Sequence, residues 1–281
     1  VMVMPPVYHP YFLVTEHNHR VVVYSPLVLE DGQYQIDFER FRTDVKGCKI
    51  LILSNPHNPG GRVWTREELA EIAEICYDNQ ILVISDEIHA DLTLPGYTHP
   101  TFALVSEKAR RNSLVFMSPS KAFNMPGLAS SYCIIEDEDI RRRFQTYMEA
   151  SEFSEGHLFA YLGVAAAYSN GTEWLDQVLE YIQGNIDFTD EYLKANIPAI
   201  RMIRPQASYL IFLDCRELGL SQKELVSFFV DDAHLALNDG AMFGKEGEGF
   251  MRLNVACPRS VLKQALDQIK QAYGKKHDTI A

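Results

Sequence analysis

Three continuous apolar runs, each ended by polar residues, constrain the fold of this chain more than any other feature. The runs cover residues 49–53, 81–85 and 113–116, and apolar runs of this length are typical of strands buried on both faces. Between the first two, Thr65 and Glu68 form a capping-box pattern, and apolar residues recur at helical spacing over residues 69–76. The order strand, helix, strand requires a crossover and therefore predicts a parallel sheet.

Polar residues with reactive side chains follow each of these predicted strands. Asn58 follows the first run, Asp86 the second and Lys121 the third. In open parallel sheets, ligands bind beyond the carboxyl ends of the strands. We therefore expect the three side chains to lie close together at one edge of the sheet.

The three residues carry the groups that pyridoxal phosphate requires from a protein. A lysine amine held away from water condenses with an aldehyde. A carboxylate keeps the ring nitrogen protonated, and a donor is needed beside the ring oxygen. Lys121 alone would be an ordinary loop lysine, so the prediction depends on Asp86 and Asn58.

Four segments resemble one enzyme family in order and spacing. They read SNPHNPGG from residue 54, SDEIHADL from residue 85, SPSKAFNMPGL from residue 118 and GFMRLNVACPR from residue 249. Over nearly its whole length the chain resembles the class I and II aminotransferases, which are fold type I pyridoxal-phosphate enzymes. Within that family it is most similar to the carbon-sulfur β-lyase branch, which includes cystathionine β-lyase.

The resemblance implies a role for each cofactor-facing residue. Lys121 would bind the aldehyde and later move the substrate Cα proton, Asp86 would pair with the ring nitrogen, and Asn58 would donate to the ring oxygen. Tyr8 would stack on the ring. Asn58 is also compatible with an Asx turn before Pro59, and Tyr8 with simple packing.

The resemblance also implies contacts to phosphate and substrate. Ser118 and Ser120 would bond the cofactor phosphate, although either could be an ordinary turn serine. Arg252 lies inside a strand pattern, where a buried guanidinium needs an anion. The resemblance assigns that anion to the substrate α-carboxylate; an internal salt bridge is the alternative.

Two positions depart from the aminotransferase pattern. His89 stands where many aminotransferases carry a tyrosine that tunes the ring oxygen, and histidine resembles the β-lyase branch. Gly60 stands where threonine is usual, so any contact from that hydroxyl is lost. His89 is the main sequence argument for elimination over transamination.

The activity implied is cleavage of cystathionine or related cysteine S-conjugates to pyruvate, ammonia and a thiol. Transamination is the alternative reaction, because both paths begin with removal of the same proton. A regulatory or binding protein that retains the cofactor scaffold is the alternative of another class. The resemblance further implies a small amino-acid substrate and a homodimer.

Composition and spacing argue against other classes of protein. Asp86, Glu87, His89 and Asp91 lie close in sequence, but alternating side chains of an extended segment point in opposite directions, so no metal site is expected. A net charge of -12 without a basic stripe argues against nucleic acid. No apolar stretch reaches membrane-spanning length, and five cysteines without paired spacing favour a cytoplasmic location.

The predicted fold is α/β, a mostly parallel sheet with flanking helices followed by a smaller α+β domain. We place a large cofactor-binding domain at residues 1–170 and a small domain at 171–281, divided near Gly171. Further strands are predicted at residues 129–135, 208–214 and 250–255. Helical pattern is predicted up to residue 169, a second long helix up to residue 196, and further helices at residues 222–230 and 259–273. Residues 1–4 read as a buried strand, and the resemblance implies a further N-terminal section before them.

Overall fold

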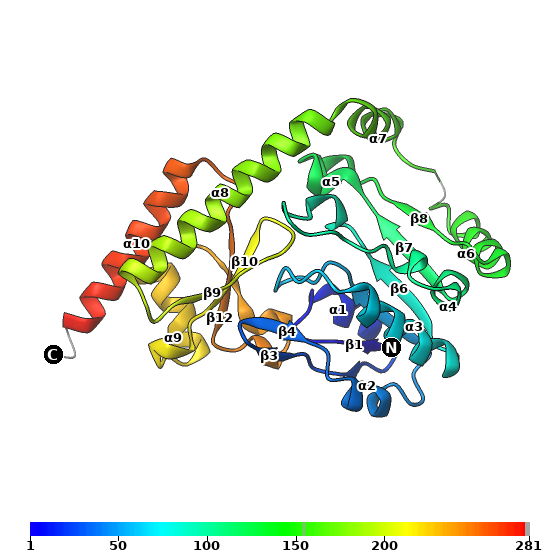
Figure 1. Ribbon diagram of the computed structural model, residues 1–281, viewed down its shortest axis with the longest axis horizontal. Coiled ribbons are helices and arrows are strands. Elements are labelled where there is room, and N and C mark those ends of the chain that lie inside the picture. The colour runs from blue at the N-terminus through cyan, green and yellow to red at the C-terminus, as the bar shows by residue number, and fades with distance from the viewer. Residues whose placement is uncertain (154, 279–281) are drawn as a thin grey trace.

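The computed structural model describes residues 1–153 and 155–278, and within them a six-stranded sheet forms the centre of one half of the molecule (Figure 1). The strand order is β2-β1-β5-β6-β7-β8, and every neighbouring pair is parallel except β7 with β8. The strands are β1 (Met2–Val3), β2 (Val23–Tyr24), β5 (Ile50–Ser54), β6 (Leu82–Asp86), β7 (Ser113–Met117) and β8 (Tyr132–Ile134). The predicted mostly parallel sheet is confirmed.

The three apolar runs form the adjacent central strands β5, β6 and β7. In the register of these strands, Ser54 pairs with Asp86 and Asp86 with Phe116, so the strand ends are level. The predicted helix between β5 and β6 is α3 (Arg66–Asp78). Its N-cap, Thr65, forms the expected reciprocal capping box with Glu68.

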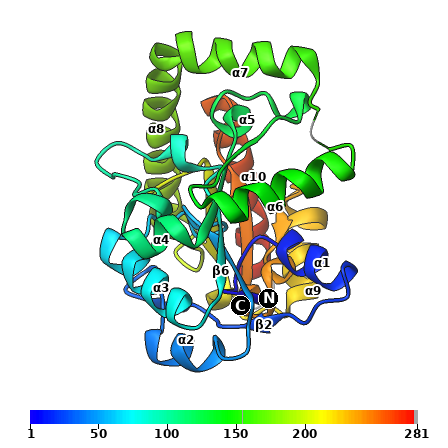
Figure 2. The same cartoon turned by 90° about the vertical axis from the view of Figure 1, so that its right-hand side faces the viewer.

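Helices cover both faces of this sheet. Figure 2 shows α3 and α4 on one side, and α1 and α6 on the other. The remaining elements of this half are a short hairpin of β3 and β4, and helices α2, α5 and α7. Their bounds are α1 (Pro10–His17), β3 (Val28–Glu30), β4 (Gln33–Gln35), α2 (Phe38–Asp44), α4 (Glu107–Arg111), α5 (Pro119–Ala122), α6 (Glu138–Ala150) and α7 (Leu158–Asn170).

A second sheet, antiparallel throughout, forms the centre of the other half. Its order is β11-β12-β10-β9, with β9 (Arg201–Ile203), β10 (Leu210–Asp214), β11 (Asn238–Asp239) and β12 (Phe250–Asn254). Around it lie α8 (Thr172–Asn196), α9 (Gln222–Ser227) and α10 (Arg259–Asp278). Helix α8 runs from this sheet to the end of α7 in the first half (Figure 1).

Two large hydrophobic cores are centred on the two sheets, and the first also takes in Phe212 and Phe250 from the antiparallel sheet. Fully buried Trp64, Leu51 and Phe41 belong to the core around the parallel sheet, whereas Ile186 and Phe229 belong to the core around the antiparallel sheet. The burial of so much apolar surface is the main stabilising contribution in both halves. The domain boundary after residue 170 stays a prediction.

Several predicted elements differ in extent. The helical pattern expected up to residue 169 is two helices, α6 and α7, and Glu152 between them has a left-handed φ of 57° that an α-helix does not accommodate. Ala129, at φ 46°, likewise lies outside the strand predicted to begin there. Residues 228–232 follow α9 as a π-helical turn, which places both Phe228 and Phe229 in the core.

Two kinds of feature are absent from the described residues. No helix there is both long enough and apolar enough to cross a bilayer. No group of three or more His, Cys, Asp or Glu side chains there is arranged to hold a metal ion.

Candidate active site

A cavity of about 260 Å³ lies beyond the carboxyl ends of β5 and β6, between the parallel sheet and β12. Its lining brings together six of the eight predicted site residues: Tyr8, Asn58, Asp86, His89, Lys121 and Arg252. The position agrees with the rule that ligands bind at the carboxyl edge of parallel strands. The other two, Ser118 and Ser120, do not line this cavity.

Asp86 is the last residue of β6, and both of its carboxylate oxygens accept hydrogen bonds. The hydroxyl of Tyr11 donates to Oδ2 at 2.7 Å, and the backbone N–H of Ile88 donates to Oδ1 at 3.2 Å. Desolvation raises the pKa of Asp86 above its ordinary value, and these two donors and the Lys121 ammonium oppose that rise. The carboxylate is therefore partly buried and is supported by donors.

Lys121 reaches the cavity from the short helix α5, which follows β7. It also lines a larger neighbouring cavity of about 550 Å³. Its amine makes no hydrogen bond or ion pair with any residue that the structure describes. The amine is therefore available to a molecule in either cavity.

Arg252 reaches the cavity from β12 and has only neutral partners. Its guanidinium donates to Oδ1 of Asn58 at 3.0 Å and to Oδ1 of Asn238 at 2.8 Å, and it lies 4.8 Å from the ring centre of Phe243. Burial lowers the pKa of Arg252. Within residues 1–153 and 155–278 it forms no salt bridge, so no ion pair with these residues competes for the guanidinium.

The side chain of Asn58 takes part in this contact instead of an Asx turn. Its carbonyl oxygen accepts from Arg252, while its backbone N–H donates to Oγ of Ser54 at 3.1 Å. The side-chain NH₂ group is left available to the cavity, since the described residues offer it no acceptor.

His89 and Tyr8 lie on the same cavity wall in different environments. His89 is buried, and desolvation, with the cations Lys121 and Arg252, lowers its pKa to about 3. Its imidazole is therefore neutral at physiological pH. Tyr8 is 36% exposed, with its ring edge-on to that of Tyr11 at 5.7 Å.

Ser118 and Ser120 are held in the N-terminal turn of α5. Ser118 is the N-cap: its Oγ accepts from the backbone N–H of Ser120 at 3.0 Å and donates to the carbonyl of Ser130 at 2.5 Å. Ser120 lines the neighbouring larger cavity. Their contact with a phosphate stays a prediction.

Close steric contacts explain why position 60 is a glycine. A Cβ atom there would lie 2.6 Å from Cδ2 of Tyr34 and 2.9 Å from Nδ1 of His57. Threonine, usual in the family pattern, would therefore displace a buried tyrosine in this chain.

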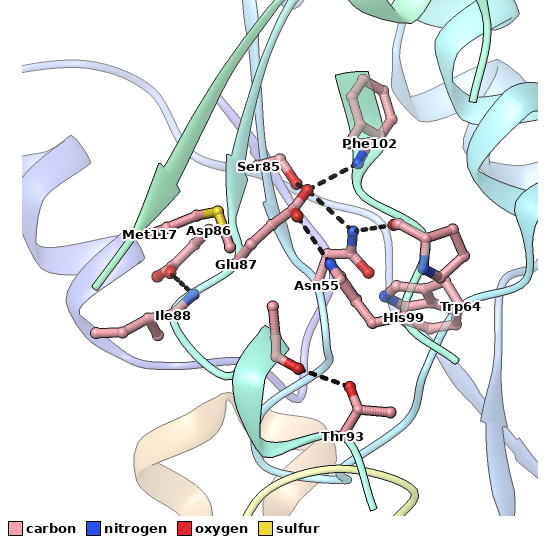
Figure 3. A network of polar contacts seen from close by, with 12 residues as sticks. Asn55, Trp64, Ser85, Asp86, Glu87, Ile88, Thr93, His99, Phe102 and Met117 are labelled. Atoms are coloured by element: carbon pink, nitrogen blue, oxygen red, sulfur yellow. Dashed lines mark hydrogen bonds and ion pairs between the residues drawn. The ribbon is translucent and has the colours of Figure 1, made fainter. Parts of the chain in front are cut away.

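Glu87 points away from the cavity into a separate polar network (Figure 3). Its Oε1 accepts from Ser85 Oγ at 2.9 Å, from the backbone N–H of Phe102 at 2.8 Å and from Asn55 Nδ2 at 3.3 Å. Its Oε2 lies 2.8 Å from Nε2 of His99. The side chains of Asp86 and Glu87 thus point to opposite sides at the end of the strand, as an extended backbone predicts.

Comparison with known proteins agrees with this arrangement. The family model for "Aminotransferase class I and II" matches residues 1–269. The chain belongs to the class I and II aminotransferase family.

Two relatives in this aminotransferase family are informative. The cystathionine beta-lyase PatB of Bacillus subtilis is 40% identical over 274 residues, which cover 97% of this chain and 71% of PatB. The structure of cystalysin from Treponema denticola, which contains pyridoxal 5'-phosphate, has a TM-score of 0.95 at 32% identity, covering 98% of this chain and 70% of cystalysin.

A third member of the family is named for the other reaction. A pyridoxal-phosphate-bound putative aminotransferase from Clostridium difficile has a TM-score of 0.94 at 39% identity, covering 96% of this chain and 70% of its own. The family and the fold are therefore shown, and relatives of similar identity carry both reaction names.

Sequence reasoning missed four polar residues that line the cavity: Tyr11, Ser54, Tyr209 and Asn254. Tyr11 lies in the first turn of α1, three residues after Tyr8, which precedes the helix, and the two rings meet edge-on at 5.7 Å. Ser54 and Asn254 end strands that were predicted. These signals are present in the sequence, but they identify cavity residues only once it is known how α1 and β12 lie relative to the first sheet.

Proposed function

We propose that the protein is a pyridoxal-phosphate-dependent carbon-sulfur β-lyase that cleaves cystathionine or related cysteine S-conjugates to pyruvate, ammonia and a thiol. The family is that of pyridoxal-phosphate enzymes, and PatB and cystalysin support the lyase branch. The observation that carries the proposal is one cavity that holds both a lysine amine and a guanidinium, for which the described residues offer neither a partner to the amine nor an anion to the guanidinium.

The donor set of the cavity fits the cofactor. Lys121 offers an amine without a partner among the described residues, Asp86 a carboxylate, and Asn58 an amide NH₂. Buried Nδ1 of His89 and Nε of Arg252 also lack hydrogen-bond partners among those residues. Buried polar atoms are rarely left unpaired, so these groups support a polar ligand here.

When bound, pyridoxal phosphate supplies an aldehyde that captures an amine and a ring that withdraws electrons from the substrate Cα. Asp86 would accept the hydrogen bond of the protonated ring nitrogen, and Asn58 would donate to the ring oxygen. Tyr8 would stack against the ring, with Ser118 and Ser120 near the phosphate.

The substrate would be held by its carboxylate and deprotonated by the lysine. Arg252 has its two terminal nitrogens already oriented by amide oxygens, so it can present a planar pair of donors to an α-carboxylate. The amine of Lys121 then takes the Cα proton as a general base. Loss of the Cβ thiolate completes the elimination, and water releases pyruvate and ammonia from the remaining fragment.

His89 supports elimination in this proposal, because histidine at this position resembles the β-lyase branch, whereas many aminotransferases carry a tyrosine there. Because its pKa is lowered to about 3, it adds no positive charge beside the ring oxygen. In transamination, Lys121 would deliver the Cα proton to another atom, and the thiolate would stay on Cβ.

The test is pyruvate release from L-cystathionine by the purified protein with excess pyridoxal phosphate. Lys121→Ala should abolish it, whereas Lys46→Ala, a change at an exposed lysine, should not. Amino-group transfer to a keto acid without pyruvate would replace the lyase assignment with an aminotransferase. Cofactor binding without either reaction, with a cellular phenotype that survives Lys121→Ala, would favour a regulatory protein.

We also propose that the protein acts as a homodimer in the cytoplasm, with a large domain at residues 1–170 and a small domain at 171–281. Helix α7 carries no charged residue, and its Leu158, Phe159 and Leu162 are 67%, 63% and 60% exposed. Exposed apolar surface of this kind is typical of protein interfaces, which supports a second copy as the partner. Sedimentation of the protein and of a Phe159→Asp variant tests the dimer.

A further inference from the structure

Tyr11 lies in the site, but the function proposed above gives it no role. It lies on α1, is 8% exposed, and its hydroxyl donates to Oδ2 of Asp86 at 2.7 Å. Its ring packs with Val3 and Val7 in a small apolar cluster. The packing would be served equally by phenylalanine, so the hydroxyl needs a separate explanation.

The hydroxyl stabilises the ionised form of the Asp86 carboxyl group at the end of β6. Desolvation raises the pKa of Asp86, and the neighbouring Glu87 carboxylate adds to the rise. Tyr11 from α1, the N–H of Ile88 and the ammonium of Lys121 from α5 act in the opposite direction. Further ionisable groups on the cavity wall are Tyr8, His89, Tyr209 and Arg252.

Tyr11 itself stays protonated and therefore remains a donor. Burial, followed by the charge of Asp86, raises the pKa of the Tyr11 phenol well above its usual value. The Ser54 hydroxyl lowers the pKa of the phenol slightly and does not reverse this rise. Ser54 itself donates to the carbonyl of Pro56 at 3.1 Å, so the proton of Tyr11 is directed to Asp86.

We propose that Tyr11 is a positioning residue that keeps the Asp86 carboxylate ionised and oriented toward the cofactor ring nitrogen. The inference rests on the proposed function, because the ring nitrogen defines the contact that Asp86 makes. Each carboxylate oxygen has two lone-pair positions, so Asp86 keeps an acceptor for the ring while bonded to Tyr11 and Ile88.

The test compares two tyrosine-to-phenylalanine variants. Tyr11→Phe removes the donor to Asp86. Tyr34→Phe is the matched control, because Tyr34 is also buried and its hydroxyl has no hydrogen-bond partner among the described residues. Circular dichroism and the melting temperature establish that both variants fold.

The first readout is the titration of Asp86 in the cofactor-free protein, followed by ¹³C NMR with labelled aspartate and assigned through Asp86→Asn. Loss of a hydrogen bond to a charged group should move the midpoint upward by about one to two pH units in Tyr11→Phe. Tyr34→Phe should titrate as the wild type does. An unchanged midpoint in Tyr11→Phe would overturn the inference.

The second readout is the pH dependence of pyridoxal-phosphate binding. Affinity in Tyr11→Phe should fall about tenfold or more at pH values between the two Asp86 midpoints, and recover above the higher one. A uniform loss at all pH values would indicate a merely structural role and overturn the inference. Neither readout requires turnover, so absence of lyase activity would overturn the proposed function and leave this test intact.

Discussion

Replacing Glu87 by alanine should destabilise the protein strongly, although the side chain does not reach the cavity. The Glu87 carboxyl group is 1% exposed and accepts from the side chains of Asn55 and Ser85, from the backbone of Phe102 and from His99. The donors come from three separate segments, which the carboxyl group holds together (Figure 3).

The magnitude follows from which donors can find another partner. The Ser85 hydroxyl can rotate and Asn55 also donates to the carbonyl of Pro100 at 3.3 Å, but the backbone N–H of Phe102 and Nε2 of His99 have no other partner among the described residues. Leaving a buried polar group without its partner costs about 1–3 kcal/mol, so the loss of both contacts should cost about 2–6 kcal/mol. That is a large part of a typical stability of about 5–15 kcal/mol.

Urea unfolding followed by tryptophan fluorescence measures the effect, because fully buried Trp64 lies beside the network. Glu87→Gln keeps one oxygen acceptor and should cost less, about 1–2 kcal/mol. The control is Glu71→Ala, which removes an exposed ion pair with Arg42 and should cost about 0–1 kcal/mol. A Glu87→Ala variant as stable as the Glu71→Ala control would refute the reasoning.

Three further changes have defined outcomes. Arg252→Lys should lower kcat/KM for L-cystathionine about ten- to a hundredfold, mainly through KM, because lysine cannot form a bidentate pair; an unchanged KM would contradict the carboxylate assignment. Burial lowers the pKa of His57 from 6.5 to about 4. The stability that the neutral imidazole contributes is therefore full above pH 6.5 and is lost as the pH falls toward 4, a loss on the order of 3 kcal/mol. His57→Gln should flatten the plot of unfolding free energy against pH in this range. Gly60→Ala should lower the melting temperature, and Tyr34→Ala should reduce that penalty in the double variant; additive losses would argue against the predicted clash.

The sequence predicted those parts of the site that local patterns determine. The apolar runs before Asn58 and Asp86 could only be buried strands, and the Thr65 capping box defined the helix that makes them parallel. Parallel neighbours in turn place their carboxyl ends together, which put Lys121 beside the other two.

Features that depend on tertiary packing were not predicted. Nothing near Tyr11 in the sequence indicates Asp86, because their contact depends on how α1 lies across the sheet. The choice between a salt bridge and a free guanidinium at Arg252 depended on which β11 residue faces it, and that residue is the neutral Asn238. The break between α6 and α7 depends on a left-handed residue, Glu152, that has no strong sequence signal.

The position of the cavity between two sheets has a consequence for synthesis on the ribosome. Asn58, Asp86 and Lys121 follow consecutive strands, and each strand pairs with one already made. Arg252 belongs to a sheet whose last strand is translated much later. A growing chain would therefore assemble the groups that face the cofactor ring before it has the guanidinium for the substrate, so that elimination chemistry cannot begin until β12 has been made.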